Sequence, residues 1–92
     1  MAVIVRIPTV LRSATAGRDE VLATGATVGD VLADVGRAHA GFLPRITAED
    51  GALRPFLNVF VNGDDIRFAQ GLQTPVRDGD EVSIIPSIAG GR

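Results

Sequence analysis

The chain has 92 residues, a formal net charge of −2 and 46% hydrophobic residues, which predicts one folded domain with a modest core. It contains no cysteine, which excludes disulfides, thiolate nucleophiles and cysteine-ligated metals. Its nine basic residues are all arginines and are scattered along the chain, so we expect no nucleic-acid surface. No apolar run approaches the roughly 18 residues that span a bilayer, and residues 1–6 lack the basic stretch of a signal peptide. We therefore expect a cytoplasmic protein without membrane contact.

The first segments predict a hairpin. Val3, Val5 and Ile7 alternate with other residues at the two-residue period of a strand, which Pro8 ends. Residues 9–17 are expected to form a loop, and residues 19–24 a second, antiparallel strand.

A helix is expected next. Thr27 can cap its N-terminus, with Asp30 three residues on. Four apolar residues at helical spacing should form one buried face of this helix: Val28, Val31, Leu32 and Val35. His39 falls on the same face and is expected to be a helix-end residue near the core. Gly41 is placed to end the helix in a left-handed conformation.

The second half predicts strands. Residues 42–46 are expected to be an irregular apolar segment that closes one end of the core, because Pro44 interrupts them. Residues 56–61 form the strongest strand, Asn62-Gly63 is a preferred hairpin turn, and residues 65–68 should return as a short strand. A last strand at 81–85 should end its pairing at Pro86.

This order predicts an α+β fold of the β-grasp type, with one main helix packed on a mixed sheet of four to five strands. Residues 1–86 would form the domain and residues 87–92 a flexible tail. In that tail the side chains shrink from Ile88 through Ala89 to Gly90 and Gly91, so the chain could thread into a constricted active site of another protein. The alternative is that chain ends are commonly small and disordered.

Nothing in the chain predicts an enzyme. It has one histidine, and Ser13, Ser83 and Ser87 have no base nearby in sequence. Residues 25–29 lack the Gly-Lys-Ser/Thr of a phosphate loop, which argues against a nucleotide site. The remaining candidate is a terminal carboxylate that a separate protein activates. By strand parity Phe60 and Ile85 could face outward as a docking site, or both could lie in the core.

Three stretches resemble the MoaD/ThiS-type ubiquitin-like sulfur carriers, and together they are most similar to the CysO-type carriers of cysteine biosynthesis. They are residues 5–12 (VRIPTVLR), residues 56–67 (FLNVFVNGDDIR), and residues 78–86 (DGDEVSIIP) with 88–91 (IAGG). The resemblance implies that Gly91 is adenylated with ATP by a ubiquitin-activating-type enzyme and converted to a thiocarboxylate. It also implies a cysteine-synthase-like acceptor enzyme, which holds an activated serine, and a zinc metalloprotease that releases the product.

Arg92 departs from that pattern, because it holds the carboxyl of Gly91 in a peptide bond. We hypothesise that a peptidase removes it; an altered terminus would give the same sequence. Three alternatives stay open: a carrier for molybdopterin, thiamine or a sulfur-containing natural product; a protein modifier; and a β-grasp interaction domain that never reacts.

Overall fold

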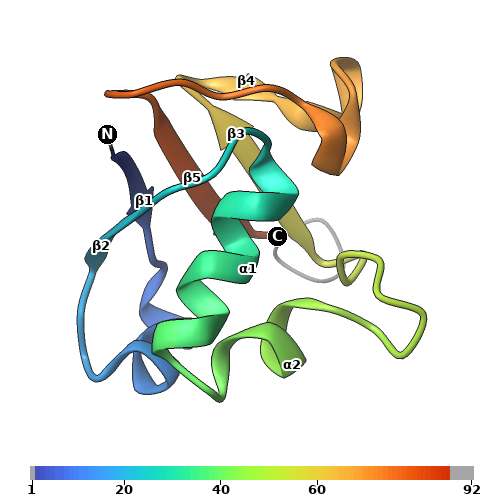
Figure 1. Ribbon diagram of the computed structural model, residues 1–92. Coiled ribbons are helices and arrows are strands. Elements are labelled where there is room, and N and C mark those ends of the chain that lie inside the picture. The colour runs from blue at the N-terminus through green and yellow to red at the C-terminus, as the bar shows by residue number, and fades with distance from the viewer. Residues whose placement is uncertain (1, 88–92) are drawn as a thin grey trace.

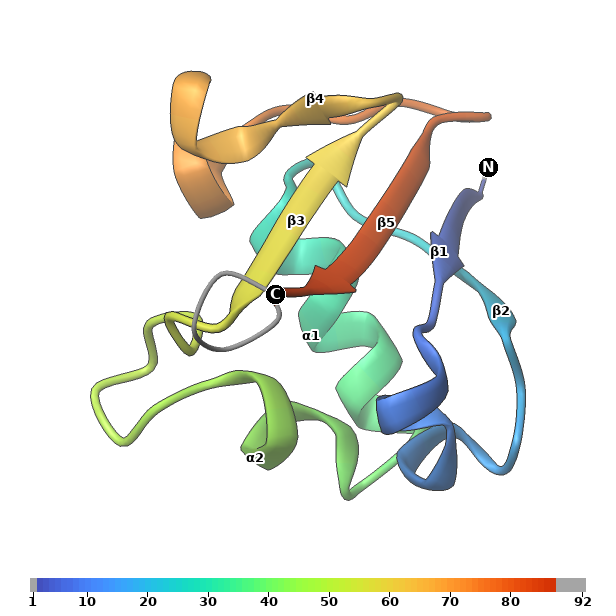
Figure 2. The same cartoon turned by 180° about the vertical axis from the view of Figure 1, so that it is seen from behind.

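The computed structural model describes residues 2–87, which form a single mixed sheet with helices on one face (Figures 1 and 2). The sheet has five strands in the order β2-β1-β5-β3-β4, with β5 parallel to β1 and antiparallel to β3. The strands are β1 (Val3–Arg6), β2 (Glu20–Ala23), β3 (Leu57–Val61), β4 (Asp64–Asp65) and β5 (Glu81–Pro86), and the α-helices are α1 (Val28–Ala38) and α2 (Phe42–Ile46). This is the predicted β-grasp fold.

Alternation along the strands builds the core. On β1, Val3 and Val5 are buried against α1 while Ile4 and Arg6 face away, and β2 repeats the pattern with Val21 and Ala23. The helix contributes the predicted stripe, which is fully buried. The apolar core comprises Val3, Val5, Ile7, Leu11, Val21, Ala23, Val28, Val31, Leu32, Val35, Phe42, Ile46, Leu57, Val59, Ile66, Val76, Val82 and Ile84.

The ends of α1 differ in how well the sequence predicted them. The Thr27 hydroxyl accepts a hydrogen bond from the Asp30 N–H at 3.2 Å, as expected for the N-cap. At the C-terminus, His39 is the helix-end residue that the sequence predicted, but the prediction that Gly41 ends the helix in a left-handed conformation was wrong. The helix ends at Ala38, His39 is an extended C-cap, and Gly41 has φ −86°, outside the left-handed region. Gly41 instead precedes α2 as its N-cap.

Residues 42–46 form a short helix, so the prediction of an irregular segment was wrong. Pro44 lies in the first turn of α2, where a backbone N–H has no partner within the helix and its loss costs nothing. Phe42 and Ile46, one turn apart, are both fully buried. They close one end of the core, as the sequence predicted.

Two connections also depart from prediction. The expected loop at 9–17 contains a 3₁₀ helix (Thr9–Thr15) that buries Leu11. The return strand expected at 65–68 is limited to β4. The Asp65 carboxylate accepts the Arg67 N–H at 2.9 Å and turns the chain into a 3₁₀ helix (Ile66–Phe68); another, Gly71–Gln73, follows.

The end of β5 corrects the prediction that pairing stops at Pro86. Pro86 lies opposite Leu57, and the Ser87 N–H donates to the Phe56 carbonyl at 2.6 Å. Because hydrogen-bonded and non-bonded pairs alternate along an antiparallel ladder, the nitrogen of Pro86 faces away from β3. It faces the side on which β1 has already ended at Arg6, so no ladder bond is lost.

Candidate functional site

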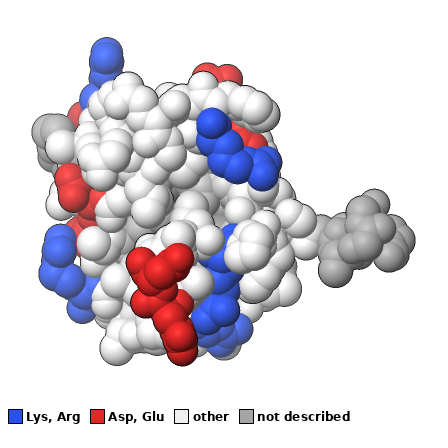
Figure 3. All heavy atoms as spheres, turned by 90° about the vertical axis from the view of Figure 1, so that its right-hand side faces the viewer, with Lys and Arg blue, Asp and Glu red and all other residues white. Residues whose placement is uncertain are grey.

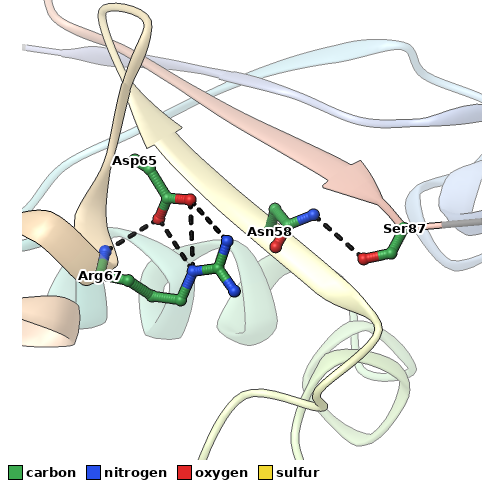
Figure 4. Close-up of polar contacts among 4 residues, drawn as sticks. All are labelled: Asn58, Asp65, Arg67 and Ser87. Carbon is green, nitrogen blue, oxygen red and sulfur yellow. Dashed lines mark hydrogen bonds and ion pairs between the residues drawn. The ribbon is translucent and has the colours of Figure 1, made fainter. Parts of the chain in front are cut away.

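The candidate site begins where β5 leaves the sheet. β5 lies between β1 and β3, and its end is joined to the start of β3 by the Ser87–Phe56 backbone bond. The Asn58 side-chain amide also donates to the Ser87 hydroxyl at 3.1 Å (Figure 4). Residue 87 is therefore held by both main chain and side chain. The predicted tail residues Ile88, Ala89, Gly90, Gly91 and Arg92 lie outside the described residues.

The sheet face opposite α1 carries the two predicted docking residues. Val82 and Ile84 point into the core, so Ile85 between Ile84 and Pro86 points outward and is 48% exposed. Phe60 has the same orientation on β3, next to buried Val59, and is half-buried. The outward orientation expected from strand parity therefore holds for both side chains. Their role in binding stays a prediction.

Phe56 belongs to the same surface, although its sequence position alone did not mark it as a docking residue. It shares strand parity with Asn58 and Phe60, is 49% exposed, and its carbonyl accepts the Ser87 N–H. The sequence predicts that Phe56 faces the same side as Asn58 and Phe60. Its position beside Ser87, where the tail begins, depends on the register between β3 and β5. Hereafter Phe56, Phe60 and Ile85 are called the tail-root patch.

Charged side chains cross the middle of the open face. The Arg6 guanidinium on β1 pairs with Glu20 on β2 at 3.1 Å and with Glu81 on β5. The hydrogen bond from Arg6 to Glu81, followed by the attraction between the two charges, raises the pKa of Arg6 above its ordinary value. This triad joins three neighbouring strands and separates the tail-root patch from exposed Leu22 on β2.

A second ion pair lies beside β3, near β4. The Arg67 guanidinium contacts the Asp65 carboxylate at 2.8 Å, in addition to the backbone bond from the Arg67 N–H to the same carboxylate (Figure 4). The side-chain hydrogen bond from Arg67, and then its backbone bond, hold the pKa of Asp65 below the ordinary value. Both charges are therefore neutralised locally.

The other residues considered for chemistry lie apart. His39 is half-buried at the end of α1, the Ser13 hydroxyl accepts from Arg45, and Ser83 lies on the open face opposite Phe60. Within residues 2–87, no group of three His, Cys, Asp or Glu side chains is placed to hold a metal ion. In that same range no helix is long and apolar enough to cross a membrane.

The chain matches the ThiS family over residues 5–91, a span that includes the tail through Gly91. Sulfur carrier protein CysO of Mycobacterium tuberculosis is 43% identical over 93 residues, covering 99% of this chain and 100% of the relative. Small archaeal modifier protein 3 of Haloferax volcanii is 42% identical over 66 residues, covering 72% of this chain and 71% of the relative. In the crystal structure of the Amycolatopsis orientalis BexX/CysO complex, one chain is 48% identical with a TM-score of 0.90, covering 98% of this chain and 100% of that chain.

Proposed function

This chain belongs to the ThiS family, and we propose that it is a sulfur carrier that holds sulfur as a thiocarboxylate on Gly91. The observation that carries the proposal is the family match through Gly91 on a β-grasp domain whose central strand leads into the tail. The similarity to a sulfur carrier over the whole chain supports it further. The chain has no cysteine, so the sulfur has to be carried on another group.

The chemistry follows from the low reactivity of a carboxylate. An activating enzyme of the ubiquitin-activating type transfers AMP from ATP to the Gly91 carboxylate and releases pyrophosphate. A sulfide equivalent then attacks the acyl carbon of the adenylate and AMP leaves, which forms the thiocarboxylate. The carrier is thus a protein co-substrate and not an enzyme. Since these steps use ATP, we place them in the cytoplasm.

Arg92 must leave first. Gly91 is joined to Arg92 by a peptide bond, and a carboxyl group in a peptide bond cannot be adenylated. We propose that a peptidase hydrolyses this bond and frees the Gly91 carboxylate. A zinc metalloprotease is the candidate class for this cleavage as well as for later product release.

The tail-root patch is the proposed docking surface for the activating enzyme. Phe56 and Ile85 are about half exposed and lie on either side of the Asn58–Ser87 hydrogen bond. Apolar side chains exposed together commonly mark protein interaction sites. A partner that covers them also has the tail within reach.

For the sulfur acceptor we propose the cysteine route, on the similarity to CysO proteins. The thiocarboxylate sulfur would attack an activated serine held by a cysteine-synthase-like enzyme and displace its leaving group. Hydrolysis of the adduct would then release cysteine and regenerate the Gly91 carboxylate. Delivery to molybdopterin, thiamine or a sulfur-containing natural product is the alternative within the same chemistry.

An intact-mass measurement tests the proposal. The protein is purified from its own host, with and without the candidate activating enzyme. The expected result is loss of one arginine residue and replacement of one oxygen by sulfur, only when the enzyme is present. A Gly91→Ala variant supplies the matched control. An unchanged mass under active sulfur supply would contradict the proposal.

A second candidate function is protein modification, favoured by the similarity to small archaeal modifier proteins. The same adenylate would then be attacked by a target lysine amine to form an isopeptide bond. This chain has no lysine, so it could not build side-chain-linked chains on itself. Immunoblots for conjugates of higher mass, compared with the Gly91→Ala variant, distinguish the two functions.

A further inference from the structure

The turn between β3 and β4 contains a chemically reactive pair, Asn62 and Gly63, which the proposed function does not use. Val61 pairs with Asp64 across the turn, so these two residues form the whole loop, and both are exposed. Asparagine is among the thermolabile residues of proteins. Its side-chain amide reacts most readily before glycine, because a residue without a Cβ leaves its own backbone nitrogen open to the neighbouring side chain.

The backbone nitrogen of Gly63 is free to react. Within residues 2–87 its N–H donates to no acceptor, since the pairing across this hairpin runs between Val61 and Asp64. A Cβ built on Gly63 would meet nothing within 4 Å, so the space beside this residue is open. The nucleophile for an attack on the Asn62 side chain is therefore in place.

The side chain of Asn62, in contrast, is held by the start of β5. Its amide nitrogen donates to the Asp80 carboxylate at 3.0 Å, and its amide oxygen accepts the Glu81 N–H at 2.9 Å. These two hydrogen bonds are called the amide clamp. Because the side chain has to rotate toward the Gly63 nitrogen before a ring can close, the reaction breaks both bonds. The amide clamp therefore opposes it.

We propose that Asn62 is a site of spontaneous deamidation and that the amide clamp restrains the reaction. The Gly63 nitrogen attacks the Asn62 Cγ and loses its proton, and ammonia leaves, which closes a five-membered succinimide ring. Water then opens the ring at either carbonyl and leaves aspartate or isoaspartate at this position. Water is the only co-reactant, ammonia is the only leaving group, and the product carries one additional negative charge at neutral pH.

Either product damages the same junction. Aspartate places a carboxylate oxygen where the amide nitrogen lies 3.0 Å from the Asp80 Oδ1, so a hydrogen bond becomes a contact between like charges. Isoaspartate carries the main chain through its side chain, which lengthens a turn that two residues close. Deamidation therefore loosens the β3–β4 hairpin and its attachment to β5, independently of any reaction at Gly91.

Peptide mapping by mass spectrometry, on the full chain incubated in mildly alkaline buffer, measures the rate of deamidation. Asp50→Asn supplies an internal comparison, because it creates a second asparagine before a glycine, in the exposed turn at 49–51. That turn lies on the side of the molecule shown in Figure 3, where acidic side chains protrude from the surface. Within the described residues, the Asp50 carboxylate accepts one hydrogen bond, from the Ala52 N–H at 3.0 Å.

We expect position 50 of this variant to deamidate about tenfold faster than Asn62, the factor that corresponds to one hydrogen bond to a charged group. Both rates come from the same molecules, so differences in folding or buffer do not affect the ratio. Equal rates at the two positions, or a faster reaction at Asn62, would overturn the restraining role of the amide clamp.

Removing the acceptor of the amide clamp provides the second comparison. Asp80→Ala should raise the rate at Asn62 about tenfold, since the bond to the carboxylate is lost. Asp78→Ala should leave the rate unchanged, because the Asp78 carboxylate accepts the Ala2 N–H and not the Asn62 amide. Backbone amide signals of the sheet verify that each variant is folded. An unchanged rate in Asp80→Ala, or no deamidation at Asn62 in any of these proteins, would overturn the proposal.

Thermal melts test the damage that deamidation causes. Asn62→Asp should melt about 4–8 °C below Asn62→Gly, the shift expected for one unfavourable pair of exposed charges in a domain of this size. Both variants lose the donor of the amide clamp, but only Asn62→Asp brings a second carboxylate to Asp80. Equal melting temperatures of the two variants would contradict this consequence.

Discussion

Ile84 and Ile85 are neighbours on β5. Substituting each of them distinguishes an effect on the stability of the fold from an effect on the proposed docking. Ile84 is 3% exposed and packs in the core, whereas Ile85 is 48% exposed on the opposite face. The perturbation is the same in both cases, replacement by alanine. Since the chemical change is identical, any difference between the variants reports the orientation of the side chain.

The expected magnitudes follow from burial. Ile84→Ala leaves a cavity in the core and should lower the free energy of unfolding by about 2–5 kcal/mol. That is a large part of the roughly 5–15 kcal/mol available to a domain of this kind. Ile85→Ala removes a half-exposed side chain and should cost only about 1 kcal/mol or less. If Ile85 is a main contact for the activating enzyme, its loss should reduce kcat/KM for adenylation by about 30-fold, which corresponds to roughly 2 kcal/mol.

Two assays on the same samples separate these effects. Urea denaturation gives the free energy of unfolding, and pyrophosphate release with the activating enzyme gives kcat/KM on protein cleaved after Gly91. Val10→Ala is the matched control, because Val10 is exposed on the Thr9–Thr15 segment away from the sheet face. Equal destabilisation by the two isoleucine variants would refute the assigned orientation. Unchanged adenylation with Ile85→Ala would refute the docking role.

Three further predictions concern the fold. Gly25→Ala should clearly lower the stability of the fold, because a Cβ there would lie 2.8 Å from the Asp30 Cβ and the Val31 nitrogen. Gly41→Ala should leave the stability unchanged, because a Cβ there would meet nothing within 4 Å. Thermal melts of the two variants compare these effects. Thr27→Ala should lower stability by about 1 kcal/mol through loss of the N-cap, measured by urea denaturation, and Thr27→Ser should restore most of it. The pKa of Asp80 is lowered from its ordinary 3.8 by the Asn62 side-chain hydrogen bond and then by the Arg77 N–H. Its contribution to stability is therefore complete above that value and is lost as pH falls from about 3.8 through the folded-state pKa. In urea titrations Asp80→Asn should flatten the acid limb, and an unchanged limb would contradict this assignment.

Regular periodicity made the central elements predictable from sequence. Apolar residues alternate with other residues along β1 and β3, and they recur at helical spacing on α1. Both patterns arise because each element buries one face in the core and leaves the other face outside it. The turn at Asn62-Gly63 was equally clear, since both residues have positive φ, 50° and 92°, as this hairpin turn requires. These features are local, so the sequence contains the information directly.

The errors arose where tertiary contacts override local preference. Pro44 suggested a break, but a proline in the first turn is compatible with the short helix that buries Phe42 and Ile46. Gly41 suggested a left-handed helix end, but α1 had already ended three residues earlier, at Ala38. The exposure of Phe56 beside Ser87 depends on the order and register of strands that are distant in sequence. No local pattern encodes this exposure.

The position of β5 places the proposed partner-binding surface and the start of the reactive tail at the same end of the sheet. β1 pairs with β5 only through Ser83, so residues beyond it are paired with β3 alone, as far as Ser87 and Phe56. Ser87 is thus held at that end of β3, and under the proposed function a partner's active site would approach it there. The tail-root patch lies there, whereas Leu22 lies across the Arg6 triad on β2. A partner that binds the patch therefore has the tail within reach, while one that binds around Leu22 would have to extend across three strands. On this geometry, substitutions in the tail-root patch should affect activation more than substitutions of equal size at Leu22.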